Sequence, residues 1–244
     1  MLFVFNKKKI NSYLISLGTV IILFTVSIIS TNKINNTIQT SAKNTEMPIS
    51  KVKTERKEVA ISINCSQNVE NIDSIIDSLS KMKVSATFYI TGEIAEKYPD
   101  EIKKIVNNGN EIGSLSDKYT NLKNKSEEEI KNSIVEANVK IEKTIGRKVS
   151  TFRPPYGECN ETIIKQARSQ NLSVVQWNID SLDYNGLNGE EIWERINENL
   201  CPGSIILMHN SAQYTANSLE DIIHNIQEKG YEIKTVNKLI AEVN

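Results

Sequence analysis

Strand-like and helix-like stretches alternate between residues 59 and 244, and this alternation restricts the fold more than any other feature of the sequence. Short apolar runs at 59–64 and 204–210 predict strands. Between such runs, apolar residues recur at helical spacing, as Ile130, Ile134 and Ile141 do. Helices that alternate with strands predict an α/β protein with a parallel sheet covered by helices.

The predicted strands share β-branched or apolar composition, and they are 59–64, 86–90, 111–116, 151–155, 173–180, 204–210 and 232–236. The predicted helices share an apolar stripe, and they are 71–83, 93–107, 126–145, 161–170, 189–199 and 218–229, followed by a final turn. Ser126 and Glu129 form a capping-box pattern at the start of one helix. In a barrel of parallel strands the functional site lies at the carboxyl ends of the strands. The polar residues predicted there are Asn64, Ser116, Arg153, Asp180 and His209.

The N-terminal part differs in composition from this body. Residues 1–30 contain Lys7, Lys8 and Lys9 and no acid. The run Ile10–Ile29 carries no charge, and as a helix it would be about 30 Å long, which is enough to cross a bilayer. The basic flank predicts a cytoplasmic stub and a single-pass transmembrane anchor in the cell membrane, with everything after it extracytoplasmic. A cleaved export signal and a buried core helix stay open as alternatives. Residues 31–58, polar and without apolar period, predict a stalk, and 59–244 the single folded domain.

Charge and cysteine content exclude further classes. The formal net charge is −1, and acids outnumber bases in 59–244, which argues against a nucleic-acid partner. Three cysteines are too few for a disulfide scaffold.

Three strings at predicted strand ends carry chemistry. Residues 153–157 read Arg-Pro-Pro-Tyr-Gly, a rigid wall beside a fixed charge or, alternatively, a tight turn with a surface salt bridge. The next, 180–184, holds two carboxylates that could tune an acid–base group, although loops are often acidic. The third, 207–210, ends a strand with His209, which a purely structural role would also explain.

Together and in this order, the strings resemble the polysaccharide deacetylase family, carbohydrate esterase family 4 with its NodB-homology domain, from about Val59 to Ile240. The nearest likeness is to the membrane-anchored, sporulation-type deacetylases of Gram-positive bacteria. The resemblance implies a distorted, incomplete (β/α)7-type barrel that removes N-acetyl groups from peptidoglycan or chitin-like glycans. It also implies a divalent metal, usually zinc, held by one Asp and two His, and a second Asp as general base. An Arg orients that base, and a late His is the general acid, tuned by an Asp.

At the matching positions, this sequence retains the family's Arg, Asp and late His but lacks its general base and its metal ligands. The resemblance assigns the retained roles to Arg153, Asp183 and His209, and it places substrate-binding walls at Pro154, Pro155, Tyr156, Tyr184 and Leu207. The general-base position is occupied by Asn64, which cannot accept a proton at neutral pH. The ligand positions hold Cys65, Leu115 and Tyr119, and the chain has only two histidines, His209 and His224, the latter expected at a helix surface or in packing. We therefore expect no metal cofactor.

Three hypotheses follow. The first is a degenerate deacetylase homologue at the cell envelope that binds cell-wall glycan without turnover. The second is an active N-deacetylase whose chemistry is rewired around a Cys65 thiolate and His209. The third is a structural envelope protein with a relic pocket.

Two local points remain open in the sequence. Cys65 could instead be a small buried residue or pair with Cys159 in a disulfide, whereas Cys201 is expected to be structural. Without the carboxylates of the first motif, Arg153 needs another anion, for which Asp180, Asp183 or a ligand carboxylate are candidates.

Overall fold

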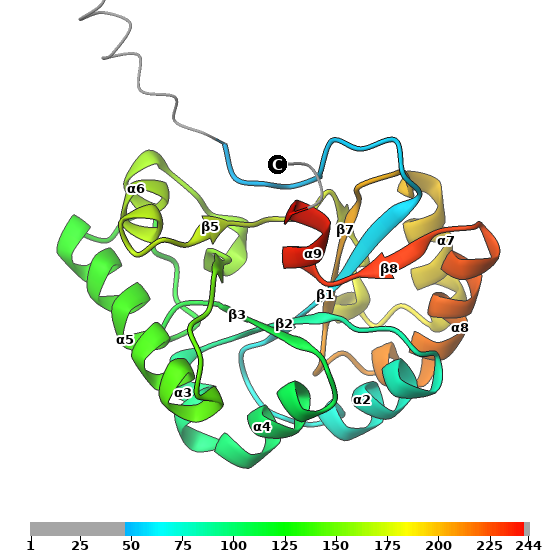
Figure 1. The fold of residues 1–244 in the computed structure, drawn as a ribbon, viewed down its shortest axis with the longest axis horizontal. Coiled ribbons are helices and arrows are strands. Elements are labelled where there is room, and N and C mark those ends of the chain that lie inside the picture. The colour runs from blue at the N-terminus through cyan, green and yellow to red at the C-terminus, as the bar shows by residue number, and fades with distance from the viewer. Residues whose placement is uncertain (1–46, 242–244) are drawn as a thin grey trace, which may run out of the picture. The chain divides into compact units, whose positions relative to one another are not determined.

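The structure is a computed structural model and describes residues 47–241. Its strands form one sheet in the order β5-β4-β3-β2-β1-β7-β6, with β8 beside the start of β1, and every pairing between named strands is parallel (Figure 1). The sheet is curled, so the described part of the chain is an α/β half-barrel, in agreement with the predicted fold class. The strands are β1 Glu58–Cys65, β2 Thr87–Ile90, β3 Glu111–Ser114, β4 Thr151–Phe152, β5 Ser173–Val174, β6 Ile179–Asp180, β7 Ile205–His209 and β8 Glu232–Lys234.

Helices follow most of these strands, as the alternation predicts. They are α2 Ile72–Lys81, α3 Gly92–Lys97, α4 Pro99–Asn107, α5 Glu127–Ile145, α6 Glu161–Ser169, α7 Gly189–Asn199, α8 Thr215–Glu228 and α9 Val236–Ala241. Two short 3-10 turns, η1 Pro155–Gly157 and η2 Asp183–Asn185, follow β4 and β6. Helices α2, α4 and α5 lie outside the curl, and α9 lies on its other side (Figure 1).

The two faces of β1 have different neighbours. Val59, Ile61, Ile63 and Cys65 belong to the core packed against the outer helices, whereas Ala60 belongs to a smaller cluster that includes residues of α9. Since side chains alternate along a strand, the odd-numbered residues of β1 face the helices and the even-numbered ones face the inside of the curl.

Two predicted elements are divided in the structure. The predicted helix 93–107 is two helices, because Tyr98 leaves the helical conformation at φ −129° and Pro99 begins α4. The predicted strand 173–180 is two strands at opposite ends of the sheet. β5 pairs with β4 and β6 pairs with β7, so residues 175–178 cross the opening of the half-barrel.

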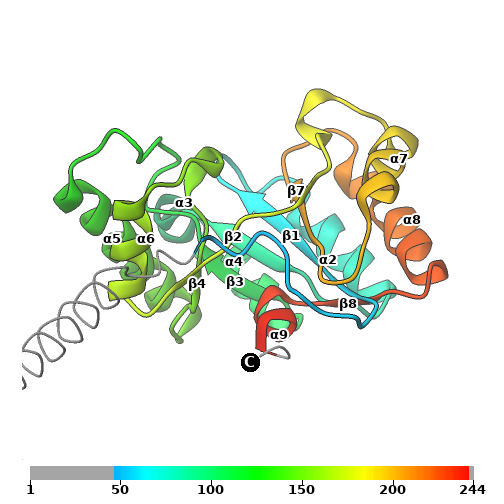
Figure 2. The same cartoon turned by 90° about the horizontal axis from the view of Figure 1, so that it is seen from above.

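Residues 47–58, predicted to be a stalk, pack against the body. Ile49 bridges Val175, and Lys51 bridges Ser204, so this segment occupies the opening between β5 and β7 (Figure 2). Its Val52 is buried. The compact unit therefore begins at Met47 rather than at the predicted boundary, Val59.

No helix within residues 47–241 combines the length and apolar character needed to cross a membrane. The predicted anchor, residues 1–30, lies outside the described residues.

Candidate functional site

A cavity of about 690 Å³ opens at the carboxyl ends of β1, β6 and β7. The residues that end these strands, Asn64, Asp180 and His209, all line it. Parallel strands place their carboxyl ends at one edge, which explains why residues far apart in sequence meet here. Ser116, also expected at a strand end, instead turns away, because its hydroxyl donates to the carbonyl of Lys118.

Arg153 lies beneath the cavity and is fully buried. Its guanidinium donates to Asn64 Oδ1 at 3.0 Å, to Ser62 Oγ at 2.9 Å and to the carbonyl of Gln176 at 3.1 Å. It also stacks 4.0 Å from the ring centre of Tyr89. All three acceptors are neutral, and burial lowers the pKa of Arg153 to about 10.

The proposed counterions of Arg153 bind elsewhere. Asp180 accepts from the backbone N–H of Leu182 at 3.0 Å, and Asp183 accepts from His209 and Thr215. The expectation that one of these carboxylates pairs with Arg153 is therefore wrong. The physical reason is that both follow β6, where local donors satisfy them first.

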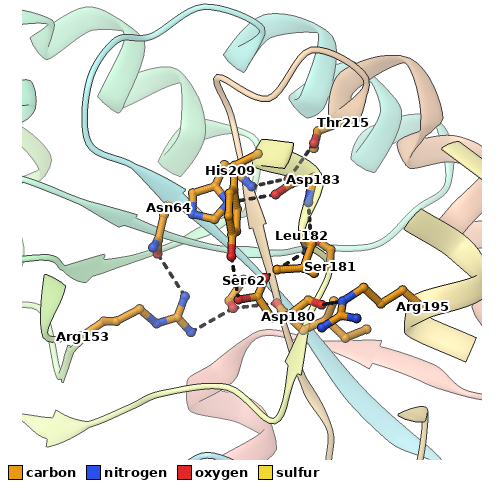
Figure 3. Close-up of polar contacts among 12 residues, drawn as sticks. Ser62, Asn64, Arg153, Asp180, Ser181, Leu182, Asp183, Arg195, His209 and Thr215 are labelled. Carbon is orange, nitrogen blue, oxygen red and sulfur yellow. Dashed lines mark hydrogen bonds and ion pairs between the residues drawn. The ribbon is translucent and has the colours of Figure 1, made fainter. Parts of the chain in front are cut away.

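Asp183 and His209 form a close pair. Asp183 Oδ1 lies 2.8 Å from His209 Nδ1, while Oδ2 accepts from the His209 backbone N–H at 2.7 Å and from the Thr215 hydroxyl at 2.6 Å (Figure 3). The carboxylate is completely buried, and 17% of the His209 side chain is exposed. This arrangement fixes the ring and presents its other edge to the cavity.

Aromatic rings surround the mouth of the cavity. Tyr184 is 53% exposed, and its ring meets that of His209 edge to face at 5.1 Å. Tyr156 is 56% exposed, and its ring lies 4.4 Å from that of Tyr119. Trp177, on the segment between β5 and β6, also lines the cavity.

Only some of the predicted substrate-binding residues line the cavity. Tyr156, Tyr184 and Leu207 line the cavity, whereas Pro154 and Pro155 are buried and do not. Trp177 and Gln67 also line the cavity, and neither was predicted from the sequence. Trp177 was missed because residues 173–180 were interpreted as one continuous strand. An aromatic residue between two short β-rich runs could have indicated that the chain leaves the sheet there and crosses the opening of the half-barrel.

The predicted degenerate metal positions do not converge. Cys65 lies in the core on the helix-covered face of β1, and burial raises the pKa of its thiol. Leu115 is a buried residue of the inner apolar cluster. Tyr119 lines the cavity, but burial raises the pKa of its hydroxyl, which keeps it a poor ligand.

These residues do not fit the divalent metal implied by the resemblance. Within residues 47–241, no group of three or more His, Cys, Asp or Glu side chains is arranged to hold a metal ion. Cys65 also cannot serve as the cavity thiolate of the rewired hypothesis, because its side chain faces the core and stays protonated.

The remaining cysteine and histidine expectations have clear outcomes. Cys65, Cys159 and Cys201 are all free, so the disulfide considered between the first two is absent from the described structure. His224 lies on the exposed side of α8 and pairs with Glu228 at 3.2 Å, as expected for a surface residue.

The parallel half-barrel and its cavity define the class of α/β half-barrel proteins whose site lies at the carboxyl ends of parallel strands. The profile of the polysaccharide deacetylase family matches residues 51–175, and the chain belongs to this family.

Several relatives agree with this membership. A peptidoglycan-N-acetylglucosamine deacetylase of Bacillus cereus is 34% identical over 185 residues, which cover 74% of this chain and 67% of the relative. The Bacillus subtilis peptidoglycan-N-acetylmuramic acid deacetylase PdaA is 27% identical over 76% of this chain and 73% of its own length. In contrast, the match to the Listeria monocytogenes deacetylase PgdA spans 43% of that protein, so more than half of PgdA lies outside the matched region.

Solved structures share the fold. BA3943 of Bacillus anthracis, described as a CE4 family pseudoenzyme, is 28% identical with a TM-score of 0.77, covering 80% of this chain and 69% of that one. The peptidoglycan deacetylase PdaC of Bacillus subtilis is 30% identical with a TM-score of 0.70, covering 79% of this chain and 93% of that one.

Proposed function

We propose that this chain is a cell-envelope member of the family that binds an amino-sugar glycan of the peptidoglycan or chitin type without N-deacetylating it. The observation that carries the proposal is the cavity of about 690 Å³, which has an aromatic rim and contains the hydrogen-bonded pair of Asp183 and His209. The positions that match the family's metal ligands hold Cys65, Leu115 and Tyr119 instead.

The binding part of the proposal depends on the aromatic rim. Tyr156 and Tyr184 stand more than half exposed on η1 and η2 at the mouth of the cavity, where a sugar ring can stack on either face. Asn64, Gln67 and Gln213 line the interior with amide groups that match sugar hydroxyls and acetamides. Several relatives are named as deacetylases of peptidoglycan amino sugars, which supports a glycan of that type.

The absence of N-deacetylation is proposed from the chemistry of the donor set. Leu115 has no donor atom, Cys65 faces the core, and Asn64 cannot act as a carboxylate base. BA3943, whose wild type is described as a pseudoenzyme of the same family, offers a precedent among similar folds.

The proposed location is the outer face of the cell membrane. Support comes from the basic stub and uncharged run of residues 1–30, which precede the compact unit beginning at Met47. Fractionation of cells followed by protease treatment of intact spheroplasts tests it. The body should be degraded from outside while the chain sediments with membranes, and a soluble or protected chain would contradict this placement.

Glycan binding is tested by fluorescence titration of the purified full-length chain with chitotetraose. The chain has two tryptophans, so a Trp193→Phe background leaves Trp177, in the cavity wall, as the reporter. We expect a saturable change, and Tyr184→Ala should weaken the affinity by about 2- to 12-fold, because one stacking contact contributes about 0.5–1.5 kcal/mol.

The matched control for Tyr184→Ala is Val139→Ala, which removes another exposed apolar side chain, from α5. It should leave the titration unchanged. A linear, non-saturable response to both chitotetraose and a muramic-acid-containing oligosaccharide would favour the relic-pocket hypothesis. Acetate release from the same N-acetylated oligosaccharides in the presence of zinc would contradict the absence of N-deacetylation.

A further inference from the structure

The hydrogen-bond partners of His209 determine its tautomer. Its Nδ1 lies 2.8 Å from a carboxylate oxygen of Asp183. A carboxylate only accepts, so Nδ1 carries the ring hydrogen and Nε2 of the neutral ring keeps a lone pair. With the ring lining the cavity, Nε2 is a base already oriented toward a bound molecule.

The partner of Asn64 determines which way its amide points. Arg153 only donates, so the atom 3.0 Å from its Nη1 must be the carbonyl oxygen Oδ1 of Asn64. The NH₂ group of Asn64 is therefore its remaining polar group, and the residue lines the cavity. Arg153, fully buried behind it, strengthens Asn64 as a donor by polarising its carbonyl.

The base and the donor stand next to each other. Asn64 and His209 are register partners on the parallel strands β1 and β7, and neighbouring strands of a sheet lie about 4.8 Å apart. Figure 3 shows the two side chains next to each other. Both side chains line the same cavity. A general base beside a hydrogen-bond donor is the pair that hydrolysis of an acyl group requires, one for water and one for the oxyanion.

We propose that this cavity hydrolyses O-acetyl esters of amino sugars without a metal ion, with His209 as general base and Asn64 as the oxyanion donor. The inference relies on the proposed glycan binding for recognition of the sugar. A water oxygen attacks the ester carbonyl carbon while its proton passes to His209 Nε2, and Asn64 Nδ2–H holds the resulting oxyanion. The tetrahedral species collapses, the bond from carbon to the sugar oxygen breaks, and that oxygen takes the proton back from Nε2. The products are acetic acid and the free sugar hydroxyl.

The same residues are insufficient for an N-acetyl group. Resonance stabilises the amide carbonyl against attack, and the nitrogen must be protonated before it can leave. A divalent metal ordinarily offsets part of this barrier by several kcal/mol, and the residues here do not fit one. An ester carbonyl has weaker resonance stabilisation and its alkoxide is a better leaving group, so a base and one hydrogen-bond donor are sufficient for its hydrolysis.

The test is acetate release from chemically O-acetylated chitotriose by the full-length chain in excess EDTA. We expect turnover that His209→Gln lowers by about 100-fold or more in kcat/KM. His224→Gln is the matched control, since it removes the chain's other imidazole from an exposed position on α8 and should leave the rate unchanged. A rate equal for His209→Gln and wild type would overturn the proposal, because the hydrolysis would then be nonspecific.

Asn64→Asp separates this chemistry from that of the family. The substitution restores the family's base residue but removes the donor, so EDTA-resistant ester hydrolysis should fall by about 100-fold. An unchanged or higher rate would overturn the role of Asn64. Each variant is checked by its circular dichroism and by the chitotetraose titration, so a loss of rate with retained binding reports chemistry rather than misfolding.

The wild-type result distinguishes the two proposals. Saturable glycan binding without acetate release in EDTA would overturn the esterase while leaving the proposed function intact. Absence of both binding and release would overturn both. Acetate release that stops on EDTA addition and returns with zinc would also overturn the inference, because hydrolysis would then depend on a metal.

Discussion

Arg153 brings a positive charge into the interior with only neutral oxygens to receive it. Its three hydrogen bonds go to Asn64, Ser62 and the carbonyl of Gln176, and its Nε has no acceptor. Burial of such a charge is costly, which is why the pKa of Arg153 falls to about 10. The aromatic face of Tyr89, 4.0 Å away, offsets part of this cost.

A carboxylate in place of the Asn64 amide should stabilise the fold. Asn64→Asp converts a neutral hydrogen bond to Arg153 into a charge-assisted one, which we expect to raise the free energy of unfolding by about 1 kcal/mol at pH 7. Because the arginine depresses the pKa of the new carboxyl, the gain should be present above about pH 4 and be lost as the pH falls further. Urea unfolding at several pH values measures it, and a less stable variant at pH 7 would contradict this account.

Four positions separate this chain from the family's metal chemistry. The variant combining Asn64→Asp, Cys65→Asp, Leu115→His and Tyr119→His restores the base, one Asp ligand and two His ligands. Because Cys65 faces the helix-covered core and Leu115 lies in the inner apolar cluster, the new side chains do not meet at one point. We therefore expect the variant to retain no more zinc after dialysis than the wild type, as measured by mass spectrometry of the metal. A BA3943 mutant is described as a pseudoenzyme with restored enzymatic activity, so the measurement compares this chain with a similar fold. A folded variant that retains one zinc ion per chain would show that the ends of β1 and β3 can present these side chains together.

The elements of this fold carry signals that are readable locally. Helix α5 begins with Ser126 as N-cap, whose hydroxyl accepts from the backbone of Glu129 while the Glu129 carboxylate accepts from the backbone of Ser126. It ends at Gly146, in the left-handed conformation at φ 72°. Both ends were predicted from sequence, because capping depends on residues within one turn.

The capping box gives α5 a predictable pH dependence. Hydrogen bonds from Ser126 lower the pKa of Glu129 to about 2, below its ordinary value of 4.5. A lowered pKa in the folded state means that the stabilisation is present above pH 4.5 and is lost as the pH falls toward 2. Glu129→Gln should therefore be less stable than wild type at neutral pH, with the difference narrowing across that window.

Thermal unfolding of both chains between pH 7 and pH 2 measures this difference. Glu128→Gln is the control, because Glu128 lies in the same first turn but is not the capping residue. A gap that stays constant down to pH 2 would contradict the assignment.

The half-barrel as a whole depends on a segment that looks unstructured in the sequence. Residues 49–52 occupy the opening between β5 and β7, where Val52 N–H donates to the carbonyl of Gly203 at 2.9 Å. A Cβ on Gly203 would lie 1.8 Å from the carbonyl oxygen of Val52. Glycine at this position is therefore required by the approach of the N-terminal segment as well as by its φ of +79°.

Two glycine substitutions separate these requirements. Gly146→Ala, at φ +72° with open space around it, should cost only the left-handed backbone strain, about 1 kcal/mol. Gly203→Ala adds a clash with the Val52 carbonyl and should cost about 2 kcal/mol more. Chemical denaturation measures both, and equal losses would show that residues 47–58 do not pack as described.

The periodic parts of this fold were predictable from the sequence, and so was its family. Strand and helix alternation indicated a parallel α/β barrel, and the order of the Arg153, Asp183 and His209 strings indicated polysaccharide deacetylases. Such signals are local, because apolar period and capping depend on neighbouring residues.

What the sequence could not supply depends on contacts between distant segments. The break between β5 and β6, the packing of residues 47–58 and the neutral partners of Arg153 all arise from residues far apart in the chain meeting across the curl. The direction of Cys65 follows from the pleat of β1, which assigns it to the core, while its neighbour Asn64 faces the cavity. Only the assembled sheet determines which of two adjacent residues meets a ligand, because a shift of one position in a strand exchanges its two faces.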